Sequence, residues 1–183
     1  MANEDRALLE RAQTSAAGFG ELFDAYYDRI YAYAYRRVGA RDAAEDIAAS
    51  VFADAWRAIK RVRWQGKPLV AWLYRIAARR VADAYRARRA DVPLEEMADA
   101  AYAAVGDDWD RAEAMAAVRR GIAQLRAVDR EIIRLVYFDE CRGDEIAALL
   151  NCTPNTVYAR THRALKRLAA WVRSEEQNGR ADG

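Results

Sequence analysis

The stretch from Thr153 to Arg173 has the residue types of a DNA-reading helix. It carries five cations, Arg160, Arg163, Lys166, Arg167 and Arg173, and no carboxylate. Polar side chains come first, and the cations follow them. A helix that enters the DNA major groove needs this order, because its N-terminal side chains read base edges and later cations meet phosphates. The residues that we expect on DNA are Thr153, Asn155, Thr156, Tyr158, Arg160, Arg163, Lys166 and Arg167.

The residues in front of this helix predict a helix-turn-helix. A first short helix is expected over Asp144–Leu150, with Asn151 at the turn. Asparagine adopts the left-handed backbone conformation of such a turn more readily than most residues other than glycine. Thr153 offers a hydroxyl as N-cap, and Pro154 suits the first helical position. Val157, Ala164, Leu165 and Leu168 recur at helical spacing and are expected to hold the second helix to its domain. The alternative is a solvated basic helix on a core domain.

A second basic stretch, Lys60–Pro68, reads KRVRWQGKP. Cations interleaved with an aromatic residue suit unpaired nucleic acid, because a base stacks while the cations hold the backbone. An ordinary polar connection, with Trp64 folded back on the core, is the alternative. The helix expected next, Leu69–Arg89, places Arg75, Arg79 and Arg86 within about 40° of one another. This block is typical of a surface that tracks phosphates.

An acidic stripe is expected on the helix over Ala43–Ile59. Asp42, Asp46, Ser50 and Asp54 advance by four residues each and share one outer face. Such a stripe is either a solvated face or a docking surface for a basic partner.

Composition and charge favour an all-α chain of two small domains. The 183 residues carry a net charge of +2 and are 53% hydrophobic, and the only three prolines each stand where a helix could open. No alternating apolar pattern is long enough for a strand. We expect a flexible N-terminus at 1–20, a helical domain at 21–89, an acidic linker at 90–110, a helix-turn-helix domain at 111–173 and a polar tail at 174–183.

Several function classes are disfavoured by the sequence. Cys141 and Cys152 are the only cysteines, so no disulfide framework is implied. With His162 they form a possible ligand set, but without the close spacing of a metal site, so we expect no metal and no cofactor. We expect no membrane insertion either, because no apolar run is long enough and the N-terminus lacks a signal pattern. The expected location is the cytoplasm.

Three stretches together resemble a known family. They are AAEDIAASVFADAW (Ala43–Trp56), PLVAWLYRIAARRVADAYRARR (Pro68–Arg89) and LRAVDREIIRLVYFDECRGDEIAALLNCTPNTVYARTHRALKRL (Leu125–Leu168). In order and spacing they are similar to regions 2 and 4 of the extracytoplasmic-function group of sigma factors, in the sigma-70 family of bacterial RNA polymerase initiation subunits. Ala49-Ser50 stands where that family usually has Gln-Glu, Cys141-Arg142-Gly143 replaces a more typical Leu-Ser-Tyr, and Asn151 replaces a usual glycine.

The resemblance implies a role for each part. The Ala43–Trp56 helix would dock on the clamp coiled coil of the polymerase β′ subunit through Asp42, Asp46, Ser50 and Asp54. Apolar surface on the second domain would meet the β flap, and the linker would pass near the RNA exit path. The Thr153–Arg167 helix would read the promoter −35 element. Residues that would capture an unstacked base of the −10 element or hold its backbone are Lys60, Arg61, Arg63, Trp64, Lys67, Arg75, Arg79 and Arg80.

The resemblance also implies that the chain performs no catalysis and that an anti-sigma factor covers it before use. A rival hypothesis is a stand-alone helix-turn-helix regulator that binds DNA without polymerase, but it leaves the basic loop and the Ala43–Trp56 helix unexplained. A second rival is an enzyme built on Cys141, Cys152 and His162.

Overall fold

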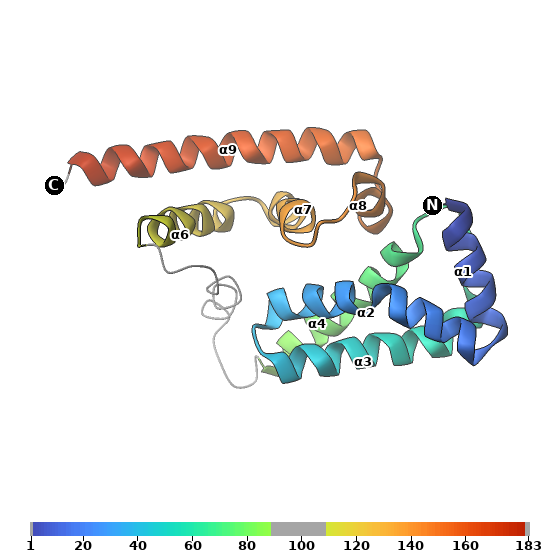
Figure 1. Ribbon diagram of the computed structural model, residues 1–183. Helices are drawn as coiled ribbons and strands as arrows, with labels where there is room; N and C mark the ends of the chain where they lie inside the picture. The colour runs from blue at the N-terminus through green and yellow to red at the C-terminus, as the bar shows by residue number, and fades with distance from the viewer. Residues whose placement is uncertain (1, 89–108, 182–183) are drawn as a thin grey trace. The chain divides into compact units, whose positions relative to one another are not determined.

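A computed structural model describes residues 2–88 and 109–181 of the chain. They fall into two compact units, the first built mainly on residues 2–88 and the second mainly on residues 109–181. All regular elements within these ranges are helices (Figure 1). The prediction of an all-α chain with two small helical domains is therefore confirmed. Residues 90–108 of the expected linker lie outside the described residues, and Trp109 and Asp110 begin helix α6.

The first unit opens with two helices joined by a tight corner. Helix α1 spans Ala2–Thr14 and α2 spans Ala16–Val38. Ser15 caps α2, because its hydroxyl accepts the N–H of Gly18 at 3.0 Å. A Cβ on Gly18 would lie 2.2 Å from the carbonyl oxygen of Arg11, so only glycine permits this approach. Gly39 ends α2 in the left-handed conformation, at φ 70°, which glycine adopts without steric cost.

Two further long helices complete the first unit. Helix α3 spans Arg41–Ala58 and continues into the short 3-10 helix η1, Ile59–Arg61, while α4 spans Leu69–Arg88. Helices α2 and α3 lie side by side, and α4 packs against both (Figure 1). The core holds Leu22, Ile30, Val51, Leu73 and Ala77, all fully buried. Burying one leucine or isoleucine side chain contributes roughly 1.5–3 kcal/mol, so this core stabilises the unit.

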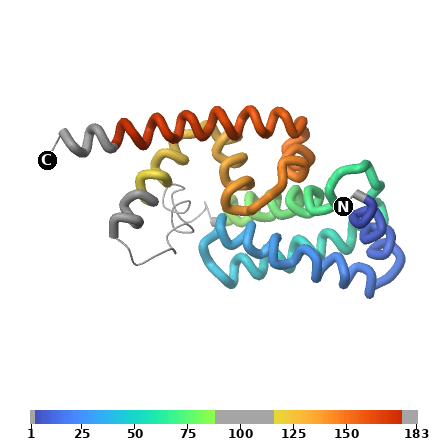
Figure 2. The backbone as a smooth tube through the Cα atoms, turned by 45° about the horizontal axis from the view of Figure 1, so that its top comes forward, coloured from blue at the N-terminus to red at the C-terminus, as the bar shows by residue number. Residues whose placement is uncertain are grey.

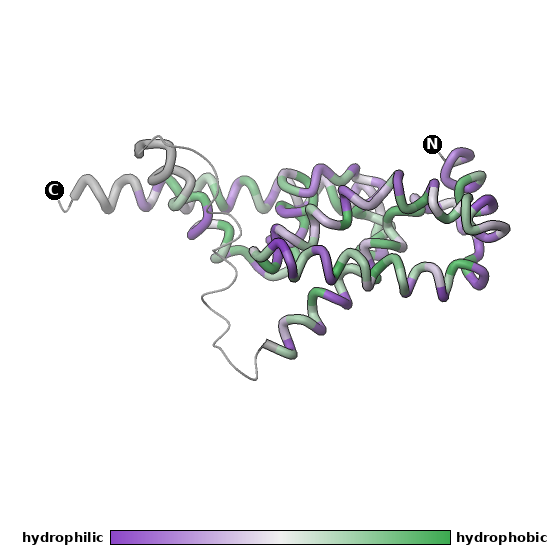
Figure 3. The backbone as a smooth tube through the Cα atoms, turned by 60° about the horizontal axis from the view of Figure 1, so that its bottom comes forward, coloured by the Kyte–Doolittle hydropathy of each residue, from purple (hydrophilic) through white to green (hydrophobic). Residues whose placement is uncertain are grey.

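The second unit contains four helices. They are α6 (Trp109–Ala123), α7 (Ala127–Tyr137), α8 (Gly143–Leu149) and α9 (Pro154–Ala181). The long α9 runs along α6 and α7 (Figure 2). Ile122, Leu125, Ile133 and Ala164 form a buried cluster, with Leu168 packed against it. Hydrophilic and hydrophobic bands alternate along the helices of both units, as the helical period requires (Figure 3).

Both ends of the described chain differ from expectation. The stretch expected to be flexible at 1–20 is helical from Ala2, because Leu9 and Ala12 are buried at 2% exposure each. The stretch expected as a polar tail at 174–183 continues α9 to Ala181. Arg120 of α6 lies 3.7 Å from Glu175, which ties that extension to the unit. None of the helices in the described ranges has both the length and the apolarity needed to cross a bilayer.

Candidate nucleic-acid interface

The turn of the helix-turn-helix has the predicted local geometry. Asn151 adopts φ 51°, the left-handed conformation that lets the chain reverse after α8. The hydroxyl of Thr153 accepts the N–H of Thr156 at 3.2 Å and lies 2.9 Å from the Thr156 hydroxyl. Thr153 is therefore the N-cap of α9, and Pro154 occupies its first position. Ahead of the turn, Glu145 accepts the N–H of Arg142 at 2.9 Å, which caps α8.

Helix α9 presents a polar and basic face to solvent. Val157 and Ala164 are buried and fix which side of the helix faces the unit. Tyr158 is 76% exposed, and Asn155, Arg163 and Lys166 are exposed as well. Thr156 and Arg160 lie half-buried at the edge of this face. The helix thus places polar side chains in its first turns and cations in the next two, the arrangement required for groove entry.

One residue of α9 differs from expectation, and another has a partner inside the unit. Leu165 is expected to hold the helix to its unit, yet it is 37% exposed. Arg167 is expected on DNA, but its guanidinium donates to Oδ2 of Asp129 in α7 at 3.0 Å. Asp129 sits within the first turn of α7 and is 9% exposed. A buried carboxylate needs a partner, and Arg167 provides it.

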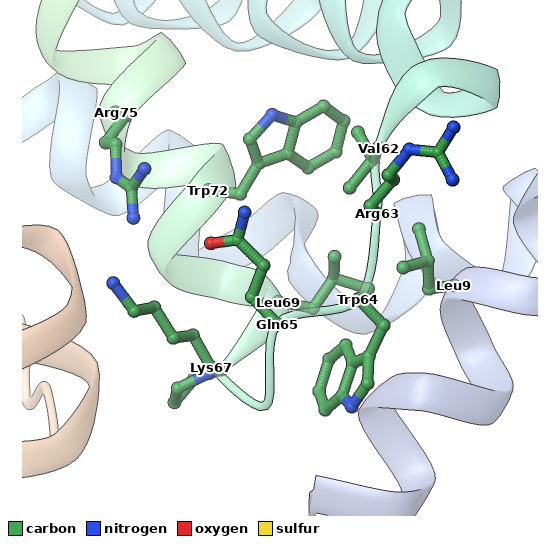
Figure 4. Close-up of a pocket in the computed structure, with 10 residues that line it drawn as sticks. Leu9, Val62, Arg63, Trp64, Gln65, Lys67, Leu69, Trp72 and Arg75 are labelled. Atoms are coloured by element: carbon green, nitrogen blue, oxygen red, sulfur yellow. The ribbon is translucent and has the colours of Figure 1, made fainter.

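A pocket in the first unit gathers the basic loop and two tryptophans (Figure 4). Its volume is about 220 Å³. Its walls come from α1, the loop and the start of α4: Leu9, Val62, Arg63, Trp64, Gln65, Lys67, Pro68, Leu69, Trp72 and Arg75. Lys67 and Arg75 project toward the same side of the pocket, whereas Arg63 points away from them (Figure 4). Cations thus stand around an aromatic recess, which suits a base with its phosphates.

Trp64 is less accessible than the sequence suggests. It is half-buried, with its indole directed toward α1 (Figure 4). Trp64 thus has features of both interpretations of the loop, because its ring packs on the unit, as in an ordinary connection, and still lines the pocket that could accept a base. Leu9, Gln65 and Trp72 are pocket residues that the sequence reasoning did not select. Trp72 follows the buried Leu69 by three positions and so lies within about 60° of it on the helix, which means that the helical period does not separate it from the core.

The cations of α4 do not all serve one surface. Arg75 and Arg79 are exposed on the outer side of the helix. Arg80 is expected with them, but its Nε donates to Oδ2 of Asp54 on α3 at 2.7 Å. At 100° per residue Arg80 points about 100° away from Arg79, toward α3. Arg80 therefore joins two helices of the unit instead of extending the basic surface.

The same ion pair occupies Asp54, the last residue of the acidic stripe on α3. Asp42 and Asp46 are exposed, and Ser50 is half-buried. Asp54 also accepts from Arg57 at 3.1 Å, so its carboxylate is shared by two guanidinium groups. Asp42 and Asp46 are thus the carboxylates of this stripe that remain open to a partner.

The two cysteines differ in burial. Cys141 is buried, and its thiol lies 3.7 Å from the carbonyl oxygen of Asp139, while Cys152 is half-buried. Among the described residues, no group of three or more His, Cys, Asp or Glu side chains is placed to hold a metal ion.

Comparison with known proteins places these features in a family. The sequence matches the models of sigma-70 region 2 over residues 22–90 and of sigma-70 region 4 over residues 115–168. Two helical units that carry regions 2 and 4 in this order define the sigma-70 class of transcription initiation factors. The chain belongs to the extracytoplasmic-function group of RNA polymerase sigma factors within that class.

Individual relatives give the extent of the similarity. BldN of Streptomyces coelicolor is 32% identical over 167 residues, covering 88% of this chain and 63% of BldN. SigD of Mycobacterium tuberculosis is 31% identical over 172 residues, covering 90% of this chain and 81% of SigD. The structure of CnrH in complex with the cytosolic domain of CnrY gives a TM-score of 0.63 at 27% identity, covering 93% of this chain and 97% of CnrH. The chain thus spans just under two thirds of BldN and about four fifths of SigD.

Proposed function

We propose that this chain binds core RNA polymerase, recognises the promoter −10 and −35 elements and promotes DNA melting for transcription initiation. The observation that carries the proposal is the presence of two different candidate nucleic-acid surfaces in one chain. The second unit holds a capped helix-turn-helix with an exposed polar and basic helix, and the first holds a pocket of cations around aromatic rings. The helix-turn-helix suits duplex DNA, and the pocket suits an unpaired base. A stand-alone regulator does not account for the match of residues 22–90 to region 2.

We assign the −35 element to α9. Asn155 and Tyr158 stand in its first turns and are exposed, so they are the residues proposed for base edges, with Thr156 beside them. Thr153 orients this end of the helix through its cap. Arg163 and Lys166 follow on the exposed face, and Arg160 at its edge, and they are proposed for phosphates.

We assign the −10 element to the pocket of the first unit. An unpaired base would stack against Trp64 or Trp72, and the nearby Lys67 and Arg75 would neutralise its phosphates. Arg79 extends this surface along α4. Exposed Lys60, Arg61 and Arg63 would meet the backbone on the other side of the loop.

We assign polymerase binding to helices away from these surfaces. Asp42 and Asp46 of α3, with Ser50 beside them, are proposed for the β′ clamp coiled coil. In the second unit, Tyr137 at the end of α7 is an exposed large apolar side chain, at 54%, and it is proposed for the β flap. CnrH was solved with the cytosolic domain of CnrY, and we propose that an anti-sigma factor likewise holds this chain in the cytoplasm until it is released. The chain itself would catalyse no reaction.

The direct test is run-off transcription with purified core polymerase on a library of promoter fragments, with and without this chain. New transcripts from a defined subset of fragments are expected, and their shared sequences would give the two promoter elements. Binding of the isolated chain to duplex DNA at high affinity, with no core binding and no new transcripts, would overturn the proposal.

A further inference from the structure

Helix α1 presents three side chains to the basic loop of the first unit. Asp5, Leu9 and Gln13 are spaced by four residues and so share one face of the helix, turning by about 40° at each step. We call the segment 62–68, between η1 and α4, the capture loop. Each of the three side chains meets either an end of the capture loop or the pocket that it lines.

Gln13 holds the beginning of the capture loop. Its side-chain Nε2 donates to the carbonyl oxygen of Ile59 at 2.9 Å and to that of Val62 at 2.7 Å. The acceptors are the backbone carbonyls of the first residue of η1 and of the residue that follows its end, 46 and 49 residues away in sequence. One amide group, with its two hydrogens, thus fixes the direction in which the loop leaves η1.

Asp5 holds the end of the capture loop. Its Oδ2 accepts the backbone N–H of Leu69, the first residue of α4, at 3.0 Å. The first N–H groups of a helix have no partner within it, and a carboxylate there is favoured by the helix dipole. Oδ1 of Asp5 accepts the hydroxyl of Tyr26 in α2 at 2.9 Å, so the carboxylate itself is held in place.

Helix α1 is anchored firmly enough to serve as a brace. Its last turn meets Gly18 of α2 so closely that no Cβ fits there, and Arg11 pairs with Glu21 at 2.7 Å. Leu9, between the two polar contacts, is 2% exposed and forms part of the pocket wall (Figure 4). The position of the pocket therefore depends on α1 as well as on the capture loop itself.

We infer that α1 holds the capture loop in the conformation that accepts an unpaired base, and that Asp5 and Gln13 are positioning residues for this step. The inference rests on the proposed function of the pocket. It adds an element that the sequence assigned to a flexible end of the chain. When both contacts are removed, Trp64 and Lys67 lose their fixed places relative to Trp72 and Arg75, and the pocket loses its preference for a base.

The test uses holoenzyme assembled from core polymerase and the full chain. The probe is a promoter fragment chosen by run-off transcription, with its −10 segment single-stranded, and the matched probes carry one abasic site at successive −10 positions. The ratio of the Kd for the abasic probe to the Kd for the intact probe reports base capture. For wild type we expect a ratio of at least about fivefold at one position, since stacking of one base supplies that much.

The double variant Asp5→Ala/Gln13→Ala is expected to bring this ratio below about twofold while core binding stays within about twofold of wild type. Arg6→Ala/Glu10→Ala is the matched control, because this exposed pair, 2.9 Å apart, lies on α1 outside the contacts with the capture loop. The control is expected to keep the wild-type ratio. Gln13→Met, which retains length but cannot donate, is a milder variant and is expected to lower the ratio with the fold intact.

The outcomes separate the two proposals. A full wild-type ratio in the double variant, or in Gln13→Met if the double variant does not fold, would overturn the role of α1 and leave the pocket assignment standing. A wild-type holoenzyme that binds core yet discriminates at no position would overturn the pocket assignment itself, and the role of α1 with it.

Discussion

Arg80 of α4 and Asp54 of α3 are bound to each other, with Nε 2.7 Å from Oδ2. By sequence pattern each belongs to a different binding surface, Arg80 to the basic block and Asp54 to the acidic stripe. Their side chains are 36% and 30% exposed, so the pair lies at the rim of the helix packing. Its function is to join α3 to α4, and it separates the surface proposed for DNA from that proposed for polymerase.

Adjacent arginines on α4 should therefore differ in their effect on DNA binding. Arg79→Ala is expected to reduce the slope of log Kd against log salt by about 0.7–0.9, the loss of one phosphate contact. Arg80→Ala is expected to leave the slope unchanged and to lower the free energy of unfolding by about 0.5 kcal/mol. The measurements are holoenzyme binding to promoter DNA over a salt series and urea unfolding of the chain. An equal loss of slope in both variants would contradict the assignment of Arg80.

The same comparison applies to α9. Arg163→Ala is expected to weaken promoter binding and to reduce the salt slope by about 0.9, because Arg163 is exposed on the proposed groove face. Arg167→Ala is expected to change the slope little and to destabilise the second unit by about 1 kcal/mol, since it leaves Asp129 without its guanidinium partner. Binding titrations and thermal unfolding of both variants provide the check. If Arg167→Ala reduced the salt slope without lowering the free energy of unfolding, Arg167 would be assigned to the DNA surface instead.

Replacement of Trp64 should separate melting from duplex binding. Trp64→Ala removes one stacking surface of the pocket, so we expect open-complex formation to fall at least about fivefold, with binding to the closed duplex within about twofold. Trp64→Phe retains a π face and is expected to retain most of the activity. Permanganate footprinting of unpaired thymines measures melting, and gel-shift assays on ice measure closed binding. Equal losses in the two assays would show that Trp64 only supports the fold.

Two glycines in helices should respond oppositely to alanine. A Cβ on Gly121 of α6 would lie 2.5 Å from Cδ1 of Leu168 and 2.7 Å from Cε3 of Trp171, whereas a Cβ on Gly20 would have none of the described atoms within 4 Å apart from its chain neighbours and the adjacent backbone of its own helix. Gly121→Ala is expected to cost roughly 1–3 kcal/mol through overpacking. Gly20→Ala is expected to stabilise by up to about 1 kcal/mol, because alanine favours the helix. Thermal unfolding of both variants decides the matter, and a stabilising Gly121→Ala would refute the close α6–α9 packing.

The features predicted correctly from sequence are those fixed by neighbours in the chain. The left-handed Asn151 and the Thr153 cap each depend on one backbone position and the residues within a turn of it. Helical periodicity likewise gave Val157 and Ala164 as buried residues of α9, because the apolar spacing is a local property.

The features that were missed depend on residues far apart in sequence. Arg80 and Asp54 are 26 residues apart, Arg167 and Asp129 are 38, and Gln13 lies 49 residues from Val62. A solvated arginine and a paired one look the same in a sequence, since the choice depends on which helix packs alongside. The ordered α1 was not expected either, because its composition is mostly polar and Leu9 and Ala12 are buried only by helices that follow later in the chain.

The length of α9 makes the second unit convenient to follow by fluorescence. The helix runs without a break from Pro154, at the proposed DNA end, past the exposed Ser174. The twenty residues between them span about 30 Å at the helical rise. A dye on a Ser174→Cys variant, with Cys152→Ser to prevent second labelling, would sit on the same helix as the residues proposed for DNA, about five turns further along it. Small rotations of that unit on a promoter would become large changes in energy transfer to a dye on the DNA.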